Sequence, residues 1–153
     1  MMKRWLIFLT AFVLFGVGFT EAQAVKDGFG KMTLSDGSVY EGQFKDGKFD
    51  GKGRLDYADQ RQYTGGFKNG LYDGKGALLY TDGSKYEGQF KKGLLNGQGV
   101  LTYADGGSYK GQFKDGDISG QGVVTNFDGT KDKGRFKDGG IDNSEITNSS
   151  DNK

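Results

Sequence analysis

Aspartates recur at one position of this sequence, each directly before a glycine, and paired carboxylates can carry out acid–base chemistry on glycosides. They are Asp36, Asp82, Asp105 and Asp128. An Asp-Gly pair between alternating apolar residues is also a strong hairpin signal, because aspartate there hydrogen-bonds its own backbone. We therefore interpret these aspartates as turn residues. The chain has no histidine and no cysteine, and we predict no catalytic residue, no cofactor and no metal site.

Gly-x-Gly pairs also resemble a chemical motif, because glycine-rich loops can cradle phosphate groups. The pairs are Gly28/Gly30, Gly51/Gly53, Gly74/Gly76, Gly97/Gly99 and Gly120/Gly122. A phosphate site of this kind needs a helix that follows the loop and points its N-terminus at the phosphate. No helical pattern follows these pairs, so we expect them to be structural.

A row of lysines is the first candidate binding surface. The lysines recur every 23 residues and are Lys45, Lys68, Lys91, Lys114 and Lys137. Stacked hairpins would align them about 10 Å apart on one polar face. Near an anionic lipid surface each lysine would contribute about 1 kcal/mol. The alternative is a solvated row that keeps the sheet soluble and blunts edge pairing.

Apolar residues on the same polar face form a second candidate surface. They are Ala77, Leu79, Val100 and Val123, whereas the first hairpins carry Thr33, Arg54 and Asp56 there. Exposed apolar surface often marks a binding site for a partner. The alternative is local covering by linkers or by the twist of the sheet.

These candidate residues are positioned by a repeat of 23 residues. Tyr-x-Gly-x-Phe segments begin at Tyr40, Tyr63, Tyr86 and Tyr109, and a fifth copy has Asp132 in the tyrosine position. A fixed period of about 20–50 residues is typical of an array of stacked units. Each unit predicts one hairpin, at 30–44, 53–67, 76–90, 99–113 and 122–136, with linkers between them. In the second hairpin Gln60 stands where the other copies have glycine.

Strand alternation separates an aromatic face from a polar face. In the first copy Tyr40, Gly42 and Phe44 point one way, and Glu41 and Gln43 point the other. We expect the rings of one unit to pack on glycines of the next, where a side chain would not fit. The predicted fold is all-β: an elongated, twisted antiparallel sheet or solenoid of about five stacked hairpins, preceded by a signal-peptide helix.

The repeat resembles the MORN motif (membrane occupation and recognition nexus). In the first copy the matching residues are Tyr40, Gly42, Phe44, Gly47, Gly51, Gly53 and Tyr57. Three further copies match in the same way, except that Asn126 replaces the last tyrosine of the fourth. The resemblance covers about residues 28–140. It implies an elongated sheet of consecutive hairpins that serves as a scaffold, a dimerisation platform or a targeting module at membranes.

The N-terminus has the pattern of a secretory signal peptide. Lys3 and Arg4 precede an apolar run over 5–19, and Ala22-Gln23-Ala24 provides a small-x-small cleavage site. An uncleaved membrane anchor is the alternative interpretation. We divide the chain into a signal peptide over 1–24, a repeat array over 25–141 and a disordered polar tail over 142–153.

Removal of Lys3, Arg4 and Glu21 balances the 21 basic and 20 acidic residues of the chain. A neutral domain has no global attraction to nucleic acid. We predict a non-catalytic interaction or scaffold module of the cell envelope, periplasmic or secreted, and not an enzyme. The expected partner is a protein, with a second copy of the chain and an anionic lipid as further candidates. The alternative function is a peripheral, membrane-associated protein that binds anionic lipids through the lysine row.

Overall fold

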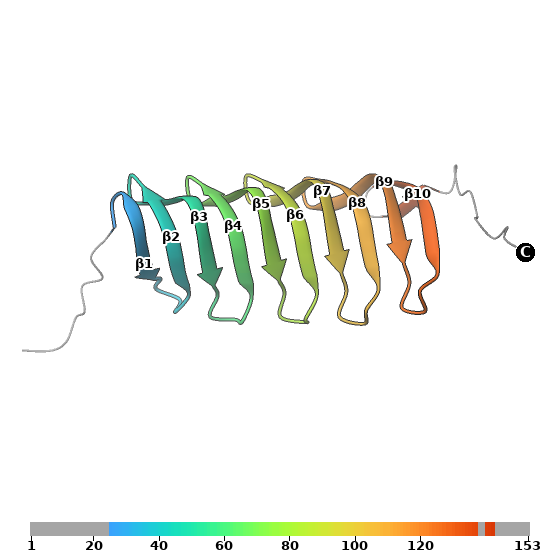
Figure 1. Cartoon of the computed structure of the whole chain (residues 1–153), viewed down its shortest axis with the longest axis horizontal. Coiled ribbons are helices and arrows are strands. Elements are labelled where there is room, and N and C mark those ends of the chain that lie inside the picture. The colour runs from blue at the N-terminus through green and yellow to red at the C-terminus, as the bar shows by residue number, and fades with distance from the viewer. Residues whose placement is uncertain (1–24, 138–139, 143–153) are drawn as a thin grey trace, which may run out of the picture.

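The computed structural model describes residues 25–137 and 140–142, which form one open antiparallel sheet of eleven strands. The strands pair in chain order and lie side by side in an elongated row (Figure 1). Their bounds are β1 (Gly28–Thr33), β2 (Val39–Lys45), β3 (Lys48–Asp56), β4 (Gln62–Lys68), β5 (Leu71–Leu79), β6 (Lys85–Lys91), β7 (Leu94–Thr102), β8 (Ser108–Lys114), β9 (Asp117–Thr125), β10 (Lys131–Lys137) and β11 (Gly140–Asp142). The predicted all-β array is thus confirmed. The predicted signal peptide, and the predicted tail from residue 143 onward, lie outside the described residues.

The longer turns of the sheet lie where the Asp-Gly pairs predict them. In the first of these turns the Leu34 N–H donates to the Ser38 carbonyl at 2.7 Å, and the Gly37 N–H donates to the Leu34 carbonyl at 3.0 Å. The Asp36 carboxylate accepts a hydrogen bond from the Ser38 N–H at 2.9 Å. The same pattern of backbone bonds recurs after β3, β5, β7 and β9. The interpretation of these aspartates as turn residues is therefore confirmed.

The segments expected to be linkers are instead the second hairpin of each repeat. Asp46 and Gly47 join β2 to β3 as a two-residue turn, with φ angles of 50° and 72°. Positive φ at both residues is typical of a type I′ turn, which matches the twist of the flanking strands and favours Asn-Gly and Asp-Gly. The expectation of linkers was wrong because these Asp-Gly and Asn-Gly pairs are hairpin signals as well. Periodic residues such as Phe49 and Tyr72 consequently lie in strands.

Gln60 adopts the backbone conformation of the glycines it replaces, with a φ of 74° against 87° for Gly83 in the next repeat. A residue with a Cβ costs about 1–2 kcal/mol of stability at this φ. Glycine removes that strain, but its greater conformational entropy in the unfolded chain offsets part of the gain. We expect Gln60→Gly to raise the free energy of unfolding by about 0.5–1 kcal/mol, measured by urea denaturation. Gly83→Gln is the matched control and should be destabilising. A loss of stability in Gln60→Gly would contradict the strain argument.

The core lies on the aromatic face, where each repeat tyrosine lies flat over two paired glycines. Tyr40 is fully buried, and Gly42 of β2 pairs with Gly53 of β3. A Cβ added to Gly53 would come within 2.6 Å of the Tyr40 ring carbon Cζ, so only glycine fits. The Tyr40 hydroxyl donates to the Gln43 carbonyl at 2.8 Å. The ring therefore covers glycines of its own repeat. The expectation that the rings pack on glycines of the next repeat was wrong.

Ring–ring contacts supply the packing between repeats. Phe49 stacks on Tyr40 with ring centroids 3.7 Å apart, and the edge of Phe67 from the next repeat meets Tyr40 at 5.0 Å. The stack depends on a bulge, because Gly42 pairs with Gly53 and Phe44 pairs with Phe49. A bulge bends a strand locally, and here it brings Phe49 over Tyr40. The same arrangement recurs for Tyr63 with Tyr72 at 3.7 Å.

The last repeat of the array loses part of this core. Asp132 stands in the tyrosine slot and is exposed, and it accepts a hydrogen bond from the Asn126 side chain at 3.2 Å. Phe136 remains buried against the Tyr109 ring at 4.9 Å between centroids. Terminal repeats of stacked arrays commonly carry polar residues in this way, because no further unit covers them.

Candidate interaction surfaces

The face opposite the aromatic core presents equivalent residues of the repeats in rows across the sheet. The cross-strand register defines a central row that runs through Lys31, Glu41, Arg54, Thr64, Ala77, Glu87, Val100, Lys110, Val123 and Lys133. Because side chains alternate along each strand, this row lies on the polar face throughout. The candidate residues predicted from the sequence can be placed relative to it.

The five lysines of the predicted row are the last residues of β2, β4, β6, β8 and β10, and all are exposed. Successive members are two strands apart, which corresponds to about 9–10 Å. In the first and fourth repeats an acidic turn residue, Asp46 or Asp115, directly follows the lysine, whereas the middle repeats have Asn69 and Lys92. The row therefore carries its greatest positive charge in the middle.

An open depression of about 700 Å³ lies at this middle part of the lysine row. Four lysines line it: Lys68 and Lys91 of the row, together with Lys75 and Lys92. Asp73 is the one carboxylate among its lining residues. Contact between the lysine row and an anionic surface stays a prediction, and at this depression four lysines lie with a single carboxylate.

The four apolar candidates share the polar face. Ala77, Val100 and Val123 are partly buried members of the central row, and Leu79 is 40% exposed in the neighbouring row. Register places Glu87 between Ala77 and Val100, and Lys110 between Val100 and Val123. The aliphatic side chains are thus interleaved with charges. Their role as a partner site stays a prediction.

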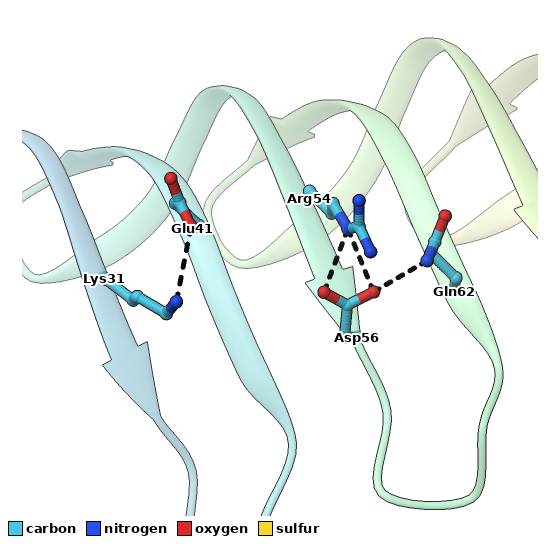
Figure 2. Close-up of polar contacts among 5 residues, drawn as sticks. All are labelled: Lys31, Glu41, Arg54, Asp56 and Gln62. Atoms are coloured by element: carbon cyan, nitrogen blue, oxygen red, sulfur yellow. Dashed lines mark hydrogen bonds and ion pairs between the residues drawn. The ribbon is translucent and has the colours of Figure 1, made fainter.

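Charges on the N-terminal part of the polar face neutralise one another. Lys31 of β1 and Glu41 of β2 form an ion pair at 3.6 Å, and Arg54 pairs with Asp56 at 2.9 Å. The Gln62 amide also donates to Asp56 at 2.8 Å (Figure 2). Farther along, Lys85 pairs with Glu87 at 2.9 Å. These contacts are exposed, so each contributes at most about 1 kcal/mol to stability, and each places a carboxylate beside a cation of this part of the face.

The C-terminal part of the polar face is basic, and only its residues Lys114 and Lys137 belong to the lysine row predicted from the sequence. Six exposed cations on β8 and β10 form what we call the basic platform: Lys110, Lys114, Lys131, Lys133, Arg135 and Lys137. Tyr109, Phe113 and Phe136 are buried on the opposite face, so alternation directs all six cations to the polar face. The signal was present in the repeat slot of Glu41, which reads Glu, Thr, Glu, Lys and Lys along the five copies.

The turn aspartates accept hydrogen bonds within their own turns. The Ser38 backbone and hydroxyl groups hold the pKa of Asp36 below its usual value, and Thr130 does the same for Asp128. Asp82 and Asp105 accept backbone hydrogen bonds at 2.8 and 2.9 Å. Among the residues that the structure describes, acidic side chains form no cluster of three or more that could hold a metal ion.

Comparison with known families agrees with this architecture. The family model of the MORN repeat matches residues 25–39, 40–60, 63–85, 86–108 and 109–131, which is more than half of the chain. A search of the curated proteins finds no match. Each matched segment from residue 40 to residue 131 begins at or near a tyrosine that lies over a glycine pair, so the match and the structure identify the same repeat. The chain belongs to the MORN-repeat family.

Proposed function

We propose that this chain is an exported, non-catalytic interaction module that acts in the cell envelope. MORN-repeat arrays are generally interaction or scaffold modules. The observation that carries the proposal is that one face of the sheet forms the core and the other face is exposed. The aromatic face is used for folding, since Tyr40, Tyr63, Tyr86 and Tyr109 are fully buried. The polar face offers exposed, periodic side chains along the array, as repeat proteins do when they bind partners over an extended surface.

The location rests on the N-terminal signal pattern. Lys3 and Arg4, the apolar run over 5–19 and the Ala22-Gln23-Ala24 site together favour export. Among the described residues there is no helix that could cross a bilayer. In the envelope the module would hold a protein partner against its polar face, with Ala77, Leu79, Val100 and Val123 as the predicted apolar contacts.

Binding to anionic lipids is the second candidate function, and one observation favours it. The depression around Lys68 and Lys91 gathers four lysines and one carboxylate. Each lysine near an anionic head group would contribute about 1 kcal/mol. The two functions would use overlapping surfaces. An experiment must therefore distinguish them by which ligand binds, a protein or a lipid, because the same residues could serve either.

Crosslinking followed by pull-down from the envelope fraction tests the interaction module. We expect the protein to recover the same partner protein at physiological and at raised salt. A Leu79→Lys, Val100→Lys variant should lose that partner, because charged groups would replace the apolar contacts. The variant should still fold, because Lys85 and Lys110 already stand beside these two positions. Recovery of no specific protein, together with pelleting on anionic liposomes that raised salt abolishes, would reject the interaction module in favour of the lipid-binding protein.

A further inference from the structure

The basic platform gathers six exposed cations on β8 and β10, and no acidic side chain among the described residues forms an ion pair with any of them. Four ion pairs occur among the described residues, and none involves a residue of β8, β9 or β10. Asp117 faces Lys114 in the register but lies beyond ion-pair distance. Asp132 lies on the opposite face, in the tyrosine slot, and Asp128 accepts hydrogen bonds from Thr130. The charge of the platform is therefore available to an external anion.

Neutral hydrogen-bonding groups fill the space between the cations. Gln112 of β8 and Gln121 of β9 line an open depression of about 500 Å³, together with Gln98, Lys110 and Lys133. Ser108 and Thr125 pair across β8 and β9 in the next row. Amide and hydroxyl groups of this kind donate and accept hydrogen bonds to neutral hydroxyls. The platform thus offers cations and hydroxyl-binding groups side by side.

The side chains of the platform argue against three other kinds of partner: nucleic acids, proteins and lipids. No aromatic ring lies on the polar face of β8–β10, so nucleic-acid bases have no stacking surface. Protein interfaces are depleted in lysine, whereas five of the six cations here are lysines. Val123 is the one aliphatic side chain of the depression, so the platform has no large apolar residue to insert among lipids.

We propose that the basic platform binds an acidic polysaccharide, a polymer of sugars that carry carboxylates. The lysines and Arg135 would pair with the carboxylates, and the glutamines and hydroxyls would bind the sugar hydroxyls. Cations at alternate positions of β10 are about 6.5–7 Å apart, and those of β8 and β10 are about 9–10 Å apart. This two-dimensional spacing suits an extended polyanion that crosses the strands. The inference goes beyond the proposed function and does not depend on where the protein is located.

The proposal is tested by measuring whether the protein binds polygalacturonate. The protein for this experiment is recovered after expression of the full chain. We expect binding that weakens as salt is raised, and no binding to neutral dextran. Lys110→Glu with Lys133→Glu should weaken binding at least about tenfold, which is about 1.4 kcal/mol. Glutamate already stands at the equivalent positions 41 and 87, so this variant should keep the fold, as circular dichroism will show.

Lys48→Glu with Lys52→Glu is the matched control. Both lysines are exposed on β3, and the variant changes the net charge of the protein by the same amount. We expect it to bind polygalacturonate like the unaltered protein. Equal losses in the two variants, no binding to polygalacturonate, or binding confined to a single-stranded polynucleotide or to anionic vesicles would each overturn the proposal.

Discussion

Gly88→Val is expected to lower the stability of the array by about 3 kcal/mol, at the upper end of the cost of overpacking a core. A Cβ at residue 88 would lie 2.5 Å from the Tyr86 ring carbon Cζ and 2.6 Å from the Gly99 Cα. One of these contacts is with backbone, and the ring is fully buried, so neither group can move away easily. We expect the melting temperature to fall by more than about 8 °C, measured by circular dichroism.

Lys85→Val on the same strand is the matched control for this variant. Lys85 is exposed, and the equivalent residue of the first repeat is already a valine, Val39. The change removes the exposed Lys85–Glu87 ion pair, which contributes about 0–1 kcal/mol. A Gly88→Val protein that melts at the same temperature as Lys85→Val would show that the tyrosine does not need a glycine beneath it.

Alkaline pH should destabilise the array, and the pKa values of the buried tyrosines determine the pH range in which this happens. Burial disfavours the charged phenolate and raises the pKa of Tyr40 and of Tyr86 to about 12, and it also raises the pKa of Tyr63 and Tyr72. Below pH 10 the phenols are protonated in both states, so their contribution to stability is fully present. Between pH 10 and 12 the unfolded chain releases these protons and the folded chain keeps them, so stability falls as pH rises.

Urea denaturation at increasing pH measures this effect. We expect the denaturation midpoint to decline steeply above pH 10. Tyr86→Phe removes one titrating group and keeps the ring; it should cost about 1 kcal/mol at neutral pH, through loss of the hydrogen bond to the Gln89 carbonyl at 3.0 Å, and should decline less steeply above pH 10. A midpoint that stays constant to the pH of complete tyrosine ionisation would contradict the link between burial and titration.

Much of the fold could be predicted from the sequence because the repeat makes each local signal appear several times. Asp36-Gly37 and its equivalents predict the longer turns, and the alternation of Tyr40, Gly42 and Phe44 predicts the buried face. The bulge that brings Phe49 onto Tyr40 could not be predicted, because a bulge depends on how the two strands pair and not on the pattern of either strand. The hairpin turn at Asp46-Gly47, in contrast, has a signal in the sequence, the Asp-Gly pair itself.

The candidate surfaces could be predicted less well than the fold. A search for residues repeated at the same slot finds Lys45 and its equivalents, but it overlooks slots whose residues change along the array. The slot of Glu41 changes sign between Glu87 and Lys110, and this change contributes Lys110 and Lys133 to the basic platform. Which of those charges are neutralised depends on side-chain contacts such as Lys31–Glu41, which a single sequence does not give.

The central claim, an exported interaction module, is tested most directly by mass spectrometry of the native protein after fractionation of the cell. We predict that the mature chain begins at Val25 and is recovered outside the cytoplasm, free of membranes after a high-salt wash. A chain that retains residues 1–24 and stays with the membranes would contradict the claim. The repeats would then be tethered at the membrane surface, and anionic head groups would become the expected ligand of the lysine row.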